Sequence, residues 1–307
     1  MKNKLTIFTP TYNRAELLKR LYNSLVEQSN KNFTWLIIDD GSKDNTKEVV
    51  EEFIKEKIIE IEYIKKENGG KHSAMDLAHE KCCTEFIAGV DSDDYLLENT
   101  IDNIYHIIEN YMEEEYVGIV GRKFDTSLRP LDKGIFEEGK KIMFHDLALK
   151  YNYKADTFLI FRTSIVKNFK FPKFEGEKFV TEKVLYDQFM YDYPMVMMST
   201  IDYIAEYQSE GYSASSINLM FNNPKGVLYA FKSDTYYMTK YKQGFKNIVI
   251  AWARYFAWRR ITKLKNLFKD EMNIKSNTKI FGWFLSIIFY IRYKSKYKNY
   301  LKASKNL

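Results

Sequence analysis

The sequence predicts an α/β protein with a mostly parallel central sheet flanked by helices. Between residues 4 and 90, short apolar runs rich in β-branched residues alternate with stretches whose apolar residues recur at helical spacing. The 307 residues are 45% hydrophobic, enough to bury one good core and to carry a smaller extension. Strands that alternate with helices in this way favour a parallel sheet with helices on both faces.

The individual elements follow from the same two periodicities. Apolar runs predict strands over residues 4–9, 33–38, 58–64, 85–90, 113–118 and 153–161, with one or two more in 195–207. Helices are predicted over residues 14–28, after Asp44, after Gly70, from about residue 96, and over 180–193. Between these elements we expect turns near Pro130 and Gly134 and an aromatic loop over residues 169–178.

Two helix starts are marked by polar side chains. Asn13 precedes the first helix, with Glu16 three residues further on, and this spacing is typical of a capped helix start. Asp44 is placed to cap the second helix. The inner face of that helix is predicted to consist of Val49, Val50, Phe53 and Ile54.

The segment Asp39–Ser42 follows the second predicted strand. A carboxylate at the end of a parallel strand can accept hydrogen bonds from a base or a ribose. Asp, Gly and Ser are equally ordinary residues for a turn followed by a helix cap, so both interpretations stay open.

The segment Asp91–Asp94 follows the fourth strand and contains three carboxylates. Carboxylates this close repel one another unless a cation neutralises them. Oxygen ligands suit Mn²⁺ or Mg²⁺, and Mg²⁺ commonly takes one or two carboxylates while phosphates and water complete its shell. The alternative is an acidic cap for the helix near Leu96. The twelve-residue pattern of a calcium loop is absent.

The segment Asn68–Ser73 contains two glycines followed by a lysine. It lacks the first glycine of the Walker spacing. Even so, Lys71 at a helix start can face a phosphate, because glycines allow the backbone to approach closely and helix N-termini attract anions. A bare turn is the alternative.

The positive charge of the chain is concentrated at its C-terminal end. The net charge is +6, but residues 241–307 carry 16 Lys/Arg and 2 Asp/Glu, a net +14, which leaves −8 for residues 1–240. Residues 245–292 interleave aromatic and basic side chains, and their longest apolar stretch, 280–291, is too short to span a bilayer. We expect peripheral contact with an anionic membrane surface. The alternative is a helical cap that packs on the rest of the chain or on a second copy, giving a homo-oligomer; no nucleic-acid partner is expected.

The N-terminus and the cysteines point to a cytoplasmic protein. Cys82 and Cys83 are the only cysteines, and neighbours in sequence cannot easily form a disulfide with each other. A reducing compartment is therefore expected. The first residues show no apolar core of signal-peptide length, so we predict an uncleaved cytosolic start at the inner face of the membrane.

Four motifs in order resemble the family 2 glycosyltransferases of the GT-A fold. They are Thr9–Arg14, Ile38–Ser42, Asn68–Gly70 and Asp91–Asp94, each after a predicted strand, and the resemblance covers about residues 4–215. It implies an inverting transferase that moves a sugar from a UDP-sugar to a glycan or lipid-linked acceptor in cell-surface polysaccharide synthesis. On this basis we expect a catalytic domain over 1–225, with a nucleotide-binding half (1–95) and an acceptor half (96–225), and a basic aromatic helical extension over 226–307.

The resemblance also implies roles for individual residues. Asp93 would be the main ligand of Mn²⁺ or Mg²⁺, with Asp91 contacting the metal or the donor ribose, and Asp40 would contact the base while Asp39 is mainly structural. Asp94 would serve the sugar or a helix cap, and Arg162 and the segment 207–215 would line the acceptor side or close over the diphosphate. The donor nucleotide would be bound by Thr9, Pro10, Thr11, Asn13, Arg14, Asp40, Asn68, Gly70, Lys71, Asp91 and Ser92.

Inversion requires a carboxylate that takes the proton of the acceptor hydroxyl. The resemblance places it in the acidic segment 175–182, with Glu182 as the first candidate, Glu177 as the second and Glu175 behind them, or else this segment is a plain surface loop. Two functions of other classes remain as alternatives: a sugar-nucleotide nucleotidyltransferase, whose Gly-rich signature is missing near the N-terminus, and a non-catalytic nucleotide-binding scaffold.

Overall fold

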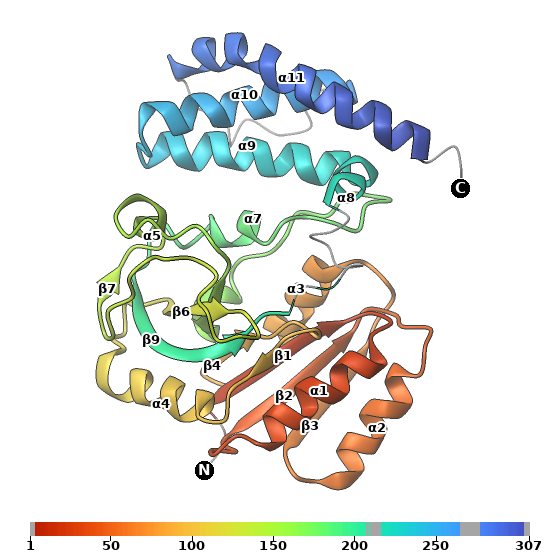
Figure 1. Ribbon diagram of the computed structural model, residues 1–307, viewed down its shortest axis with the longest axis vertical. Coiled ribbons are helices and arrows are strands. Elements are labelled where there is room, and N and C mark those ends of the chain that lie inside the picture. Colours follow the sequence, from red (N-terminus) through yellow and green to blue (C-terminus); the bar gives the residue numbers. More distant parts are fainter. Residues whose placement is uncertain (1–3, 207, 209–215, 265–276, 304–307) are drawn as a thin grey trace. The chain divides into compact units, whose positions relative to one another are not determined.

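The computed structural model describes residues 4–206, 208, 216–264 and 277–303, and it divides into two compact units (Figure 1). The first unit contains the chain up to Lys170 together with Phe189–Gln208. The second contains Phe171–Gln188 and the chain from Ser209 onward. The boundary expected at residue 225 is one between functions, a catalytic domain and an extension. It stays a prediction.

The first unit holds the strands of the described residues. They are β1 Leu5–Thr11, β2 Phe33–Asp39, β3 Glu60–Lys65, β4 Phe86–Gly89, β5 Tyr95–Leu96, β6 Gly118–Phe124, β7 Lys141–Ile142, β8 Thr157–Arg162 and β9 Met195–Ile204. Its helices are α1 Ala15–Val26, α2 Thr46–Glu56, α3 Lys71–Lys81, α4 Thr100–Tyr111, α5 Asp146–Leu149 and α6 Thr163–Val166.

These strands form one mixed sheet in the order β3-β2-β1-β4-β8-β6-β9-β5, and β7 pairs with β9. The predicted parallel pairing is present from β3 through β4. Beyond β4 the sheet changes direction, because β8 runs antiparallel to both β4 and β6. The polar segments after β1, β2 and β4 consequently meet at one edge of the sheet, as expected for parallel strands.

Helices cover both faces of the parallel part, as predicted. Trp35 on β2 stacks near Tyr22 on α1 and Phe53 on α2, with ring centroids 6.2 and 6.1 Å away. Phe8 on β1 points to the opposite face, because its register partner is Leu36, and it meets His79 on α3 edge to face. Both faces of β1 and β2 are buried, which accounts for their nearly continuous apolar sequences.

Several predicted elements are wrong in detail. The strand expected over 113–118 is β6, shifted toward Phe124, because the acidic start of the predicted run is exposed. β5 intervenes before α4, so the helix expected near residue 96 begins at Thr100. The helix expected over 180–193 is only α7, Lys183–Tyr186, since Phe189 turns away to pack against Phe161 and Phe169 in the first unit.

Two of the predicted helix details are also wrong. Asn13 is not the cap of α1: it has φ of +51°, and its side-chain oxygen accepts a bond from the Lys43 backbone instead. Ile54 is 40% exposed, because the inner face of α2 is complete with Val49, Val50 and Phe53.

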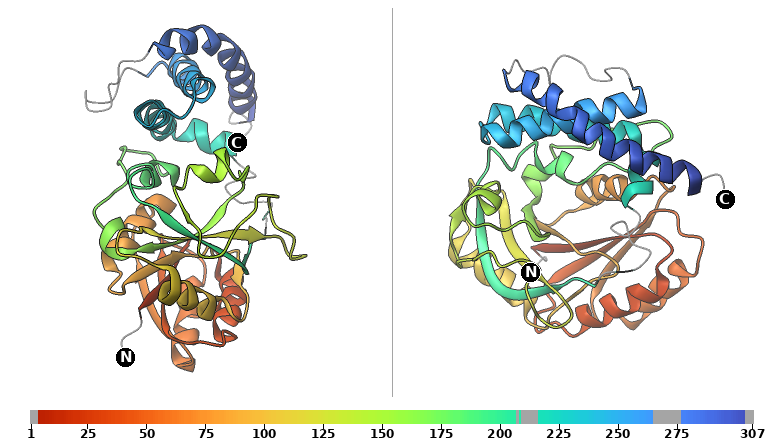
Figure 2. Two further views of the ribbon diagram at one scale, coloured as in Figure 1. Left: turned by 90° about the vertical axis from the view of Figure 1, so that its left-hand side faces the viewer. Right: turned by 45° about the horizontal axis from the view of Figure 1, so that its top comes forward.

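The second unit is helical and has its own core. Its remaining helices are α8 Ser216–Asn222, α9 Pro224–Lys240, α10 Phe245–Thr262 and α11 Thr278–Ala303. Figure 2 shows the helices α9, α10 and α11 packed side by side. Trp252 and Trp258 of α10 are buried in the core of this unit. α10 and α11 approach closely at Gly282, where a Cβ atom would lie 2.3 Å from that of Trp252. None of the described helices combines the length and the hydrophobicity needed to cross a bilayer.

Candidate functional site

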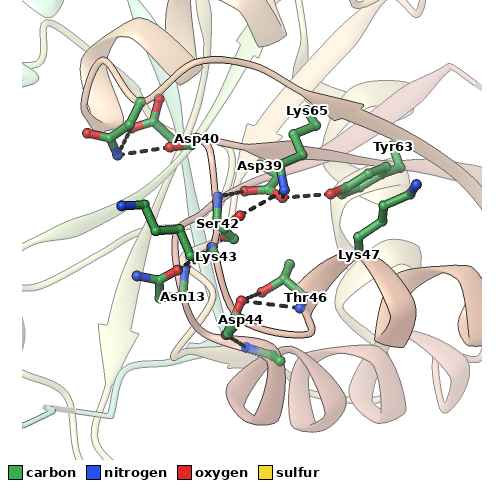
Figure 3. Close-up of polar contacts among 12 residues, drawn as sticks. Asn13, Asp39, Asp40, Ser42, Lys43, Asp44, Thr46, Lys47, Tyr63 and Lys65 are labelled. Carbon is green, nitrogen blue, oxygen red and sulfur yellow. Dashed lines mark hydrogen bonds and ion pairs between the residues drawn. The ribbon is translucent and has the colours of Figure 1, made fainter.

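The loop after β2 is held by carboxylates (Figure 3). Asp39 is fully buried and accepts bonds from the Ser42 amide at 2.7 Å and the Tyr63 hydroxyl at 2.6 Å. Asp44 accepts bonds from the Thr46 amide and hydroxyl and from the amide of Ala15, the first residue of α1. Burial acts to raise the pKa of Asp44, but these bonds lower it below its ordinary value. Both carboxylates therefore order the turn between β2 and α2.

Asp40 organises the glycine turn that precedes α3. Its two carboxylate oxygens accept bonds from the Asn68 side chain and from the backbone amides of Gly69 and Gly70. Lys66 adds an ion pair at 2.6 Å. Gly70 has φ of +88°, which favours glycine at this position. A base contact by Asp40 would have to share or replace one of these bonds, because they occupy the usual acceptor positions of a carboxylate.

The segment after β4 gathers three acids opposite three cations, all within the first unit. Lys71, the first residue of α3, lies 2.5 Å from Asp91, and Arg14 lies 2.8 Å from Asp93. Lys123 on β6 lies 3.6 Å from Asp94. Burial alone would raise the pKa of Asp91, but Lys71, Lys123 and Arg14 lower it to about 2. Each of the three carboxylates therefore has a basic partner within the chain that offsets their mutual repulsion.

Tyr203 on β9 holds the segment Asp91–Asp94 in place through hydrogen bonds. Its hydroxyl accepts a bond from the Asp91 amide at 3.1 Å and donates one to the Asp94 carboxylate at 2.5 Å. Asp94 also accepts a bond from the Glu206 amide. Burial raises the pKa of Asp94 to about 6 despite the attraction of Lys123. The Asp94 carboxylate thus links the segment after β4 to Tyr203 on β9 and to Glu206 just after it. It does not cap α4.

Arg20 on α1 contacts the same segment from another side. Its guanidinium donates to the Asp93 carbonyl, pairs with the Glu206 carboxylate and lies over the Tyr95 ring. The backbone around Asp93 is consequently fixed by α1, while its carboxylate stays partly exposed next to Arg14.

Asp91 and Asp93 offer oxygen donors of the kind that Mg²⁺ and Mn²⁺ prefer. Across the described part of the chain, no three His, Cys, Asp or Glu side chains gather as a metal site. An ion at Asp91 and Asp93 would therefore need further ligands from a bound phosphate or from water, the usual situation for Mg²⁺. The residues present fit such an ion.

Comparison with known proteins identifies the family. The family model described as "Glycosyl transferase family 2" matches residues 6–169, more than half of the chain. The chain belongs to glycosyl transferase family 2. It is therefore a member of an enzyme family, and the motifs that suggested this resemblance lie in the matched region.

Relatives of this family 2 chain come from several bacteria. It is 30% identical over 116 residues to "Glycosyltransferase GlyA" of Streptococcus pneumoniae, covering 38% of this chain and 16% of the relative. It is 27% identical over 181 residues to the "GalNAc(5)-diNAcBac-PP-undecaprenol beta-1,3-glucosyltransferase" of Campylobacter jejuni, covering 55% of this chain and 54% of the relative. The chain thus spans about half or less of these two curated relatives.

A solved structure confirms the fold class. "Crystal structure of S. aureus TarS 1-349 in complex with UDP-GlcNAc" matches with a TM-score of 0.64 and 17% identity, covering 94% of this chain and 81% of that one. An identity this low supports the fold alone. The predicted GT-A type α/β fold with C-terminal helices is nevertheless confirmed for this family 2 chain.

Most of the predicted donor-site residues of this family 2 chain do meet at one edge of the sheet. The contacts given above bring together Arg14, Asp91, Ser92, Asp93 and Lys71, with Arg14 also 3.3 Å from the Ser92 hydroxyl. Asn13 joins the loop after β2 by donating its amide to Ser42. The Asn68 side chain and the Gly70 backbone amide both donate hydrogen bonds to the Asp40 carboxylate.

The residues at the end of β1 are less open than predicted. Thr9 is fully buried, and its hydroxyl accepts a bond from the Trp35 indole at 2.9 Å. Pro10 is half-buried. Thr11 is 3% exposed, and no partner for its hydroxyl lies among the described residues. A nucleotide contact from this strand would therefore come from its backbone or from the Thr11 hydroxyl, not from the Thr9 side chain.

Arg162 is not brought to this site. It is the last residue of β8 and pairs in register with Phe86 at the start of β4, whereas Asp91 follows the other end of β4. Its guanidinium pairs with Glu85 at 2.9 Å and lies over the Phe86 ring. An acceptor role for Arg162 has no support in these contacts. The other expected acceptor segment, 207–215, lies outside the described residues apart from Gln208.

The candidate bases lie in the second unit. Glu182 directly precedes α7, is half-buried and accepts a bond from the Tyr186 hydroxyl at 3.2 Å. Glu177 accepts bonds from the Lys225 and Gly226 amides, both at 2.8 Å, so its two oxygens cap the first turn of α9. Glu175 is exposed. Of the three, Glu177 has an evident structural task.

Sequence reasoning missed Lys123, Tyr203, Arg20 and Glu206. Lys123 and Tyr203 lie on β6 and β9, whose parallel pairing joins residues about eighty positions apart. Arg20 sits within a helix, where a basic residue reads as part of the solvated face. No local motif marks these residues, and only the paired strands bring them to the acids.

Proposed function

We propose that this chain transfers a sugar from a UDP-sugar to a glycan or lipid-linked acceptor, with inversion, in the synthesis of a cell-surface polysaccharide. One observation carries the proposal: Arg14, Lys71 and Lys123 converge on Asp91, Asp93 and Asp94 at the sheet edge where strand-end ligands bind in such folds. Relatives support the substrate class, since the similar TarS structure is a complex with UDP-GlcNAc and the Campylobacter relative is named for an undecaprenol-linked sugar.

Each residue of the site has a part in this proposal. Asp93, with Asp91 beside it, would hold Mn²⁺ or Mg²⁺, which when bound neutralises charge that develops on the departing diphosphate. Lys71 stands at the N-terminus of α3, where its ammonium and the positive end of the helix dipole favour a phosphate. Arg14 would exchange its bond to Asp93 for a donor phosphate. Glu182 would take the proton of the acceptor hydroxyl.

The proposal is tested by UDP release. Purified chain is incubated with a panel of UDP-sugars and Mn²⁺, with and without sugar and lipid-linked acceptors. We expect slow hydrolysis of at least one donor and faster UDP release with a suitable acceptor. Formation of a sugar nucleotide from UTP and a sugar phosphate would instead indicate a nucleotidyltransferase, and UDP binding without any turnover would indicate a scaffold.

Tyr203→Phe tests the support of the acidic segment. Loss of the hydroxyl leaves the Asp91 amide without its bond and removes one of the bonds to the buried Asp94 carboxylate, so the free energy of unfolding should fall by about 1–3 kcal/mol. Because the segment carries Asp93, the affinity for UDP with Mn²⁺ should fall as well. Chemical denaturation and isothermal titration measure the two effects.

Tyr153→Phe is the matched control for Tyr203→Phe. Tyr153 is also buried, and its hydroxyl donates to the Asp156 carbonyl outside the acidic segment. It should lose stability but keep UDP affinity. Equal UDP affinities for both variants and the wild type would show that Tyr203 does not position the site.

We also propose that the second unit contacts an anionic membrane surface. Neither α10 nor α11 contains an acidic residue. α11 carries five lysines and one arginine, and all of them lie either before Gly282 or after Ser286. Apolar side chains of α11 are exposed, including Phe284 at 60% and Ile288 at 65%. Such a combination is typical of helices that lie in a lipid interface. This contact would keep a cytoplasmic enzyme near lipid-linked acceptors.

A further inference from the structure

The second unit carries a shallow, open surface depression between α10 and α11, called the cavity below, that the transferase chemistry does not use. Its volume is about 360 Å³. The cavity is lined by Phe256, Arg259, Arg260, Lys263, Leu264 and Trp283. Half of this lining is cationic and the other half is aromatic or aliphatic, so the cavity suits a ligand with a charged end and an apolar end.

The cations of this cavity have no acidic counterpart among the described residues. Arg259, Arg260 and Lys263 are exposed, and no carboxylate in the described part of the chain lies within ion-pair distance of them. Arg260 lies over the Tyr290 ring at 5.4 Å. One basic residue in the last turn would suffice to offset the dipole of α10. The three cations gathered at this site therefore favour the binding of an anion.

Two further lysines lie near α10 but do not line the cavity. Lys232 on α9 and Lys279 on α11 both lie 5.3 Å from the Trp252 ring. Burial lowers the pKa of Lys232, and the charges of Lys279 and Arg259 lower it further. This mutual repulsion shows that the packed helices concentrate cations from α9, α10 and α11 in one region. A multiply charged anion would relieve it.

An exposed apolar face begins at the same cavity. Trp283, one of the lining residues, contacts Phe284 with ring centroids 5.1 Å apart, and Phe281 contacts Phe245 at the start of α10 at 5.4 Å. The large exposed apolar side chains within residues 280–291 of α11 are Ile280, Phe281, Trp283, Phe284, Ile287, Ile288 and Ile291. An apolar strip of this size is unusual on a surface that meets only water.

We propose that the cavity binds the phosphate monoester of a lipid headgroup while the exposed face of α11 enters the acyl boundary of the same membrane. This inference rests on the proposed membrane contact and names the headgroup chemistry that it recognises. An arginine guanidinium can donate two parallel hydrogen bonds to two oxygens of one phosphate. Arg259 and Arg260 therefore favour a phosphate monoester over a phosphodiester headgroup, which has fewer unsubstituted phosphate oxygens. The charge pattern and the adjoining apolar strip favour lipid over free phosphate or a second copy of the chain.

The experiment measures headgroup preference with the full chain. Vesicles of phosphatidylcholine carry either phosphatidic acid or phosphatidylserine, adjusted to the same surface charge, and binding is followed by flotation in 150 mM salt. We expect the wild type to prefer phosphatidic acid by roughly tenfold, the effect of about one charge-assisted hydrogen bond. The double substitution Arg259→Gln with Arg260→Gln should abolish this preference.

The matched control removes two charges elsewhere on the same surface. Lys298→Gln with Lys302→Gln changes exposed residues of α11 that do not line the cavity. It should weaken binding to both vesicles, by about 1 kcal/mol per charge close to the membrane, and keep the preference. Loss of the preference in both variants, or a wild type without any preference, would show diffuse attraction and overturn the site. Melting temperatures confirm that both variants fold.

Two further measurements distinguish the other possible ligands, free phosphate and a second copy of the chain. Inorganic phosphate should compete weakly for the headgroup site; if it binds while vesicles do not, the ligand is free phosphate and the lipid assignment is wrong. A concentration-dependent dimer that Phe284→Ser converts to monomer would show that a second copy covers the apolar face. UDP release with a soluble acceptor is measured in every variant, so that failure of the transferase proposal is recognised separately.

Discussion

Asp93→Ala is expected to abolish Mn²⁺-dependent binding of UDP and to lower kcat/KM by on the order of 10³-fold. A bound divalent ion contributes several kcal/mol by neutralising charge on a departing group, and about 4 kcal/mol corresponds to this factor. The Asp93 carboxylate is partly exposed, and the backbone of Asp93 is already fixed by Arg20. The substitution therefore removes the ligand without dismantling the loop. Titration of UDP with and without Mn²⁺, followed by steady-state kinetics, measures both effects.

The control for Asp93→Ala is Asp102→Ala on α4. Asp102 is an exposed aspartate that accepts bonds from Ser29 and Asn30, away from the acidic segment. It should leave UDP affinity unchanged. If Asp93→Ala keeps metal-dependent affinity, the ion is held elsewhere. If it raises UDP affinity by freeing Arg14, the pair of Arg14 and Asp93 acts as a switch without a metal.

The ion pairs of the acidic segment suit two states of the site, one without a donor and one with a bound donor and metal. Each acid is matched by a cation in the present structure, so the segment is stable as it stands. A donor diphosphate with its metal would bring two negative groups and one doubly positive ion, which leaves the acids and the cations again in balance. Lys71 and Arg14 would turn to the phosphates while Asp91 and Asp93 turn to the metal. The same residues therefore suit both the free and the loaded site.

The parallel half of the fold could be predicted because its signals are local. The segments that became β1, β2 and β4 are apolar runs bounded by polar turns, and the helices between them show regular spacing. Beyond β4, strand identity depends on partners. β6 contains Arg122 and Lys123, which read as a loop, yet it pairs with β8 and β9 over most of its length.

The site was partly visible in the sequence for the same reason. Asp91 and Asp93 stand directly after a strand, and parallel pairing alone brings them to the end of β1 and to Arg14. The partners Lys123 and Tyr203 lie on β6 and β9, beyond the antiparallel strand β8, and no local spacing rule predicts that these two strands pair. Charge repulsion in the segment was overestimated, because the sequence does not show which cations lie opposite.

The aromatic C-terminal region shows the limit of composition. Trp252 and Trp258 are buried in the core of the second unit itself, while Phe284 and Ile288 are exposed. Contact with a membrane, and packing on the rest of the chain or on a second copy, both stay predictions. Composition could not assign them, because burial depends on which helix faces meet.

Glu182→Gln is expected to leave UDP-sugar affinity within about twofold of wild type and to lower kcat for transfer by at least roughly 10²–10⁴-fold, the usual contribution of a general base. Glutamine keeps the size and the bond with Tyr186 but cannot accept the proton of the acceptor hydroxyl. Donor titration and acceptor-dependent UDP release separate binding from transfer. Wild-type turnover in Glu182→Gln would move the base to another residue.

Glu177→Gln is the informative partner of this substitution, because the two glutamates differ in what they hold. Both oxygens of Glu177 accept backbone amides at the start of α9, and an amide side chain can satisfy only one of them. Its main effect should be a loss of stability of about 1 kcal/mol, as for other helix caps, with kcat largely retained. Should Glu177→Gln remove transfer at an unchanged melting temperature, the roles of the two residues are exchanged, and the cap at α9 is a secondary feature of a catalytic carboxylate.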